Sequence, residues 1–217
     1  MPTRGEIAAT FDAIADEFDA SRVKPWPETL TFESRLPRAA RVLDLGCDGG
    51  RNLAFLRERG HTAVGLDASR ALLARSVAKV GTGHILGGDA IRLPFRRGTF
   101  DAVLCVATVH HLPSPEERHQ CMTEMVRVLR PGGLAILSAW ALEQERFQAV
   151  HDEHLRERDA AVQDLFVPWR RSDGRVVQRF YHLFRAGELE RLVQSGGLAV
   201  ERAWREGDNH VVLGRRP

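Results

Sequence analysis

The chain has 217 residues, of which 43% are hydrophobic, and its net charge is +2 at pH 7. This length and composition suit one globular domain with a full core, and the small net charge by itself indicates no class of partner. The three cysteines, Cys47, Cys105 and Cys121, lie far apart, which argues against a disulfide framework and against a paired zinc site. Because no apolar run reaches membrane length and no signal peptide is recognised, we expect a cytoplasmic protein without a membrane segment.

Two helical segments are expected before the first strand, the second opened by Pro27 and running through Phe32 to Leu36. The apolar residues of the first segment recur at intervals of three and four: Ile7, Phe11, Ile14 and Phe18. This spacing predicts an amphipathic helix over residues 4–20, which Pro25 and Pro27 follow. Trp26 is held between these prolines. Its ring could stack on a base or on a cofactor, with Arg22 as a fixed cation beside it. Alternatively, the ring only fills an apolar space beneath the first helix.

Residues 41–53 contain the main functional motif of the chain. An apolar strand runs into a turn containing Gly46 and Gly50, and a helix-compatible segment follows at once. A strand, a tight glycine turn and a helix N-terminus together form a cradle of the nucleotide-binding type. Asp67 ends the next expected strand about twenty residues later, where it can accept hydrogen bonds from ribose hydroxyls.

The strands that follow indicate where chemistry would take place. Residues 101–106 read as a central parallel strand, and His110 and His111 come soon after its carboxyl end. Ligands of open α/β sheets bind at those ends, so these histidines are either near the reaction or simply part of a loop. No further ligands stand at metal-binding spacing, and we expect no metal site.

Residues 143–175 interrupt the alternation of strands and helices, and we expect residues 143–185 to form an insert that binds the substrate or RNA. A charged stretch that we expect to be helical leads to arginines interleaved with aromatic residues. This pattern suits stacking on bases and contact with phosphates, although a solvated face over a core strand has the same composition. Two further strands around the turn Gly207-Asp208-Asn209 are expected to form a terminal antiparallel hairpin.

Five stretches in order resemble the Rossmann-like S-adenosylmethionine (SAM) methyltransferases. They are D-x-G-x-x-x-G at 44–50, the acid Asp67, Gly88-Asp89-Ala90, the strand at 101–106, and Leu129-Arg130-Pro131-Gly132-Gly133. The resemblance implies a class I α/β fold, with a mostly parallel seven-stranded sheet and a C-terminal antiparallel hairpin. It implies one domain over 1–217, with a helical lid at 1–38 and a SAM-binding core at 40–140. The implied cofactor-binding residues are Asp44, Gly46, Cys47, Gly50, Asp67, Asp89, Ala90 and Val106.

One residue departs from that family pattern. Asp48 stands where the family usually has glycine. Aspartate tolerates unusual turn dihedrals, but a carboxylate at this position could repel the methionine carboxylate of SAM.

Further motifs, spread over nearly the whole chain, resemble the tRNA wobble-uridine carboxymethyl methyltransferases. They include Ser21-Arg22-Val23-Lys24-Pro25-Trp26-Pro27, Val109-His110-His111-Leu112, Q-D-L-F-V-P-W at 163–169 and Y-H-L-F-R-A-G-E-L at 181–189. The resemblance implies esterification of a carboxymethyl group on the wobble uridine in the anticodon loop of tRNA. A carboxylate is already ionised at neutral pH, so the reaction needs positioning rather than a general base.

The roles expected of individual residues follow from this reading. Arg22 is expected to hold the carboxylate, with His110 as a second donor. The other expected substrate-binding residues are Trp26, His111, Trp169, Arg170, Tyr181 and Arg185. The resemblance also implies a small zinc-binding activator subunit at the edge strand His84-Ile85-Leu86. Two alternatives stay open: a SAM methyltransferase of small-molecule carboxylates or hydroxyls, and a non-catalytic RNA-binding or adaptor protein with this fold.

Overall fold

A seven-stranded sheet forms the centre of the computed structural model, which describes residues 1–147 and 163–217. The strand order is β3-β2-β1-β4-β5-β9-β8. The strands are β1 Arg41–Leu45, β2 Thr62–Asp67, β3 Ile85–Gly87, β4 Phe100–Val106, β5 Leu129–Trp140, β8 Ala199–Glu206 and β9 Asn209–Arg215. The first five run parallel, and β9 pairs antiparallel with both β5 and β8. The predicted class I α/β sheet with its C-terminal antiparallel hairpin is therefore confirmed.

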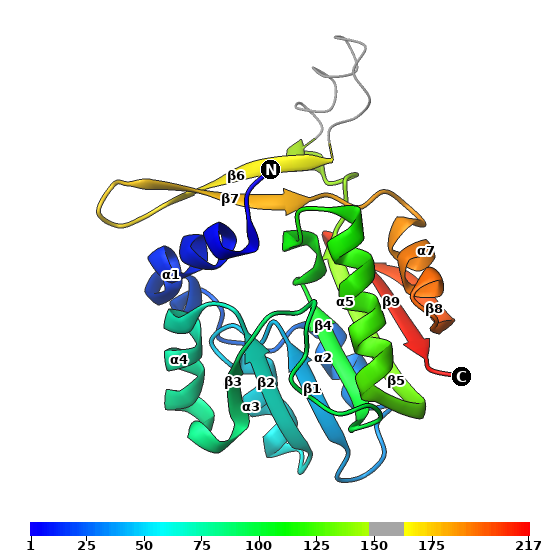
Figure 1. Cartoon of the computed structure of the whole chain (residues 1–217). Helices are drawn as coiled ribbons and strands as arrows, with labels where there is room; N and C mark the ends of the chain where they lie inside the picture. Colours follow the sequence, from blue (N-terminus) through cyan, green and yellow to red (C-terminus); the bar gives the residue numbers. More distant parts are fainter. Residues whose placement is uncertain (148–162) are drawn as a thin grey trace.

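Helices cover both faces of this sheet (Figure 1). Their bounds are α1 Arg4–Ala20, α2 Pro27–Glu33, α3 Arg51–Glu58, α4 Arg70–Val80, α5 Pro115–Val128 and α7 Glu188–Ser195. Successive residues of β4 enter different core clusters. Ala102 and Leu104 pack with α2 and α3, whereas Val103 and Cys105 pack with α5 and α7. All four side chains are completely buried, as predicted for a central strand that is apolar on both faces.

Helix α1 coincides with the helix predicted over residues 4–20. Its apolar face packs on Leu72 of α4, and polar contacts fix it at the same side. The Asp12 carboxylate accepts hydrogen bonds from Ser69 Oγ at 2.6 Å and from the Ala71 backbone at 2.9 Å. Lys79 of α4 also pairs with Asp19 near the end of α1. The helix is thereby held across the carboxyl ends of the first strands.

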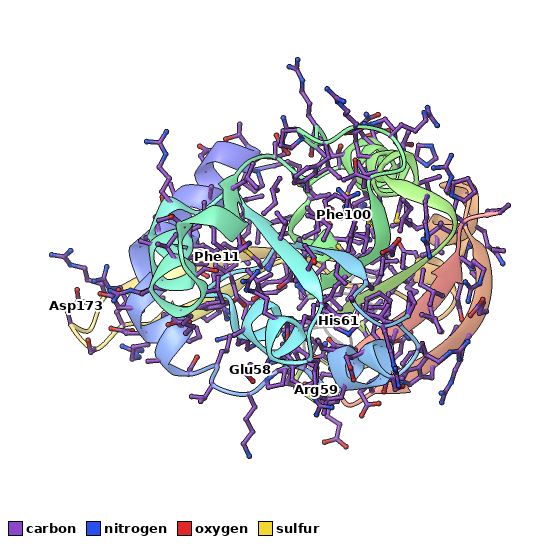
Figure 2. All side chains as sticks on the ribbon, turned by 90° about the horizontal axis from the view of Figure 1, so that it is seen from below. Phe11, Glu58, Arg59, His61, Phe100 and Asp173 are labelled. Carbon is purple, nitrogen blue, oxygen red and sulfur yellow. The ribbon has the colours of Figure 1, made fainter. Side chains whose placement is uncertain are left out.

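A separate two-stranded hairpin, β6 Asp164–Arg170 and β7 Val176–His182, lies against α1 (Figure 1). Its tip extends away from the body of the molecule, where Figure 2 shows Asp173. Glu17 of α1 accepts hydrogen bonds from Trp169 Nε1 at 3.2 Å and from the Ser172 backbone at 2.9 Å. Part of the predicted insert at 143–185 is therefore a β-hairpin. The charged stretch expected to be helical falls mainly on 148–162, outside the described residues.

The structure corrects two predicted strand boundaries. The apolar run at 134–140 predicts a fifth strand over those residues, but β5 begins at Leu129, because Leu129 already pairs with Phe100 of β4. The third strand begins at Ile85, and His84 lies in a preceding 3₁₀ turn, because pairing with β2 starts at Gly65 and Ile85. The prediction that this short strand lies at an edge of the sheet is confirmed.

Candidate active site

The carboxyl ends of β1, β2 and β4 open into a cavity of about 550 Å³. Helix α1 closes one side of it with Phe11 and Phe18, and β7 contributes Tyr181. Ten of the residues predicted for the site line this cavity: Arg22, Trp26, Gly46, Asp67, Asp89, Ala90, Val106, His110, His111 and Tyr181. The volume is in the range of cavities that enclose a small molecule.

Two glycines shape the turn between β1 and α3. Gly46 has a φ of 75°, and a Cβ built there would lie 2.1 Å from Thr108 Oγ1. Gly50 has a φ of 83°, and its Cβ would lie 2.3 Å from Ser76 Oγ. Both positions therefore combine a left-handed backbone with a close approach that excludes any other side chain. Gly50, Asp44 and Cys47 support the turn from beneath, and none of the three lines the cavity.

Asp67 ends β2 with its carboxylate fixed by two backbone donors. Oδ1 accepts from the Ser69 N–H and Oδ2 from the Asp48 N–H, each at 2.9 Å. Burial raises the pKa of Asp67 to about 6, against the effect of these donors. The carboxylate is therefore oriented and ionised at neutral pH, with lone pairs left for ligand hydroxyls.

Asp89 follows β3 and also lines the cavity. Its Oδ2 accepts a hydrogen bond from Arg4 Nε of α1 at 2.8 Å, and its Oδ1 accepts from the Ile91 backbone at 3.1 Å. The Asp89 side chain is 40% exposed, so its oxygens remain accessible beside the start of the lid helix.

Three charged side chains meet beside the glycine turn. Asp48 has a φ of 42°, and its Oδ2 lies 3.4 Å from Arg51 Nη2. Arg51 is only 7% exposed and stacks on Trp26, with 5.1 Å between the guanidinium carbon and the ring centre. Burial, together with the charge of Arg51, lowers the pKa of Arg22 to about 10, so Arg22 stays cationic at pH 7. Its guanidinium lies 3.6 Å over the Phe18 ring.

His110 and His111 are fixed in opposite tautomers. His110 Nδ1 accepts the N–H of Trp140 at 3.0 Å, which places the proton of a neutral ring on Nε2. His111 Nδ1 faces the carbonyl of Phe180 at 2.9 Å and must donate to it, so its Nε2 carries the lone pair. Burial lowers the pKa of His111 to about 4 and that of His110 well below its usual value. Both rings are therefore neutral at pH 7.

Tyr181 completes the wall beside the histidines. Its ring stacks on Trp140 with 4.0 Å between ring centres and 2° between planes. Arg179 Nη1 donates to the Tyr181 hydroxyl at 2.8 Å, and burial raises the pKa of that hydroxyl. This fixed aromatic pair supplies a flat apolar surface with a cation beneath one end.

Three predicted substrate residues lie away from the cavity. Trp169 packs on Phe18, with ring centres 5.7 Å apart, and bonds Glu17, so it ties the hairpin to α1. Arg170 and Arg185 are exposed, and neither lines the cavity. Sequence reasoning gave no role to Arg51, which is buried in the cavity wall, and it counted Arg179, which is also buried, only among the arginines interleaved with aromatic residues. The one feature of the sequence that indicated an ion pair at Arg51 was the acid Asp48, three residues earlier.

The described residues contain no cluster of three or more His, Cys, Asp or Glu side chains arranged to hold a metal ion. Among the helices that the structure describes, none is both long and apolar enough to cross a bilayer.

The parallel sheet with its antiparallel hairpin, the glycine cradle and the oriented acid at the end of β2 define a class I SAM-dependent methyltransferase. A family model described as a methyltransferase domain matches residues 43–137. The chain belongs to the methyltransferase family, as a relative that is 34% identical over nearly the whole of both proteins shows. It is also similar to several proteins named tRNA (carboxymethyluridine(34)-5-O)-methyltransferase.

Three relatives illustrate this similarity. The tRNA (carboxymethyluridine(34)-5-O)-methyltransferase of Schizosaccharomyces pombe is 28% identical over 97% of this chain and 96% of that protein. The Xenopus tropicalis alkbh8 enzyme of the same name is 28% identical over 98% of this chain, which spans only 42% of that longer protein. An Encephalitozoon cuniculi protein named as a methyltransferase is 34% identical over 94% of this chain and 92% of its own length.

Solved structures share the fold at lower identity. A SAM-dependent methyltransferase of Methanosarcina mazei superposes with a TM-score of 0.73 at 19% identity, over 89% of this chain and 98% of that chain. A chain from the complex between the Haloferax volcanii Trm112 methyltransferase activator and a methyltransferase gives a TM-score of 0.70 at 19% identity, over 97% of both chains.

Proposed function

We propose that this chain uses SAM to esterify the carboxylate of a 5-carboxymethyl-type uridine at the wobble position of tRNA. One observation carries the proposal: the cavity combines a cationic guanidinium, Arg22, with two neutral histidines. A carboxylate substrate needs a cation to place it and no base to deprotonate it. The activity named for the S. pombe relative is of this kind.

The residues at the strand ends fit the cofactor. Asp67 would accept hydrogen bonds from the ribose hydroxyls, and Asp89 would accept one from the adenine amino group. Gly46 leaves room for the ligand to approach the backbone. When bound, SAM supplies an electrophilic methyl group. The remaining charged wall, with Asp48 and Arg51, would face its amino-acid end.

The opposite tautomers of the two histidines suit a uracil ring. Uracil presents carbonyl acceptors next to an N–H donor. His110 offers an Nε2–H donor and His111 offers an Nε2 acceptor, so the pair matches this alternation. Arg22 would hold the carboxymethyl group by charge-assisted hydrogen bonds. Trp26 and Tyr181 offer apolar surface for the base.

We place the tRNA contact on the β6–β7 hairpin. Arg170 is exposed on β6, and Phe166 exposes 57% of its surface on the same strand. Their positions, four residues apart in the register with β7, put both side chains on one face of the hairpin. An exposed arginine on the same face as an aromatic ring suits phosphate contact and base stacking. Arg185, which follows β7, is also exposed. Trp169 would act here by holding the hairpin against α1.

An activator subunit is proposed at the β3 edge of the seven-stranded sheet. In the part of the chain that the structure describes, β3 pairs with β2 alone, and Leu86 in it is 37% exposed. An exposed strand edge next to an apolar side chain suits pairing with a strand of a second protein. The Haloferax neighbour was solved with a Trm112 activator, and a small zinc-binding subunit of that kind is the partner we propose.

The test is methyl transfer from labelled SAM to tRNA from a strain that lacks this gene. We expect label to enter tRNA and to be released by mild alkali, because a methyl ester hydrolyses under conditions that leave methylated bases and riboses intact. Label that survives alkali would assign the chain to base or ribose methylation. The assay is run with and without the activator, and with free small carboxylic acids as competing substrates.

The position of Asp67 predicts a pH dependence of nucleoside binding. Its pKa of about 6 means that the carboxylate ionises between pH 5 and 7, and only the ionised form accepts hydrogen bonds from both ribose hydroxyls. We expect the affinity for 5′-methylthioadenosine to rise about tenfold from pH 5 to pH 7 and then to level off. Calorimetric titration measures this rise. Asp67→Asn should bind weakly and without this pH dependence, and a flat profile for the unmodified protein would contradict the assignment.

A further inference from the structure

The charged wall beside the glycine turn contains a residue whose role the proposed function leaves open. Asp48 has a φ of 42°, a left-handed conformation that costs an aspartate more than a glycine. Its backbone N–H is already used by Asp67 Oδ2. The strained position therefore serves to place the Asp48 carboxylate in the wall of the cavity.

Two cations flank this carboxylate. Arg51 Nη2 lies 3.4 Å from Asp48 Oδ2, and Arg22 lies on the same cavity wall. Arg51 is 93% buried, and its Nε and Nη1 find no hydrogen-bond partner within residues 1–147 and 163–217. One carboxylate at 3.4 Å compensates a buried guanidinium incompletely, so a second anion nearby would be stabilised. Since Arg22 is assigned to the substrate, Arg51 and Asp48 leave one positive and one negative charge in this wall, which matches a ligand with a carboxylate and an ammonium group.

We propose that Asp48 binds the ammonium group of the amino-acid end of SAM, while Arg51 compensates its charge and attracts the ligand carboxylate. This inference rests on the proposed use of SAM. Asp67 is proposed to contact the ribose of the ligand, and Asp89 its adenine. The amino-acid end of the ligand would therefore lie at the glycine turn. Without Arg51, a carboxylate at position 48 would repel the ligand carboxylate. With Arg51 in place, the acid recognises the ligand's positive group.

Two ligands separate this role from a general effect on the cavity. S-adenosylhomocysteine (SAH) carries the amino-acid end, whereas 5′-methylthioadenosine lacks it and keeps the adenosine. Calorimetry with both ligands is carried out on the unmodified protein and on Asp48→Asn, whose side chain keeps its size and tolerates a left-handed backbone. We expect Asp48→Asn to weaken SAH binding tenfold or more and to change 5′-methylthioadenosine binding less than twofold.

A second variant and a control variant distinguish a loss of ligand contact from a loss of folding. Asp48→Gly relieves the backbone strain and should show the same selective loss of SAH affinity. Asp208→Asn removes an exposed acid in the turn between β8 and β9 that does not line the cavity, so SAH binding should change less than twofold. Thermal unfolding of each variant without ligand checks that it is folded.

Three other binding results would contradict the proposal. Tighter SAH binding by Asp48→Asn would mean that Asp48 repels the ligand carboxylate. Unchanged SAH binding would mean that Asp48 serves only as the counter-ion of Arg51. Failure of the unmodified protein to bind either ligand would instead remove the proposed use of SAM.

Discussion

Replacing Arg22 by alanine is expected to lower the rate of methyl transfer to carboxymethyluridine-containing tRNA by roughly 10²-fold or more. The Arg22 guanidinium stays charged, lies over the Phe18 ring and lines the cavity, so it is held ready for a carboxylate. Its loss removes charge-assisted hydrogen bonds that place the carboxylate against the methyl donor. Small errors in such placement are costly, because the reacting atoms must lie roughly 3–3.5 Å apart.

The measurement for Arg22 separates chemistry from cofactor binding. Single-turnover rates with saturating SAM should fall, while SAH affinity should change less than about threefold, because the cation proposed for the amino-acid end is Arg51, the partner of Asp48. Arg22→Lys should recover part of the rate, since it keeps the charge and loses the planar pair of donors. Arg202→Ala, an exposed arginine of β8, is the matched control and should leave the rate unchanged. An undiminished rate for Arg22→Ala would exclude Arg22 from the reaction.

Replacing Asp67 by asparagine is expected to weaken SAH binding roughly 10²-fold. The carboxylate accepts one backbone N–H on each oxygen, and its remaining lone pairs would receive both ribose hydroxyls. Asparagine has one acceptor oxygen, and its amide NH₂ would face either the Ser69 or the Asp48 N–H. The substitution therefore removes the charge and disturbs the turn.

Asp89→Asn provides the comparison for Asp67. Asp89 is 40% exposed and would accept a single hydrogen bond from adenine, so we expect a loss of less than tenfold. Equilibrium titration with SAH measures both variants, and thermal unfolding without ligand checks that they are folded. Equal losses at the two positions would contradict the assignment of Asp67 to the ribose.

Local features of the sequence determined the framework. Strand β1, its glycine turn and α3 adjoin in the chain, so their order alone predicts a cradle. The spacing of Phe11 and Phe18 predicts α1 because helical periodicity is a property of neighbouring residues. The acid at the end of β2 was also predictable, because parallel strands bring their carboxyl ends to one edge of the sheet.

Contacts between distant segments decided the rest. The tautomers of His110 and His111 depend on backbone groups of Trp140 and Phe180, which lie 30 and 69 residues away in the chain. Trp169 was expected at the substrate, but its indole N–H reaches Glu17, which is 152 residues away.

The sequence by itself determined the class of fold, the glycine cradle and ten of the residues in the cavity wall, because these follow from local periodicity and from motifs that resemble a known family. Only the tertiary structure decided which charges meet. Asp48 appeared to oppose the ligand carboxylate until the structure showed its carboxylate beside the buried Arg51. The energy of a buried charge depends on burial and on every neighbouring charge, and these are set by the packing of the whole chain.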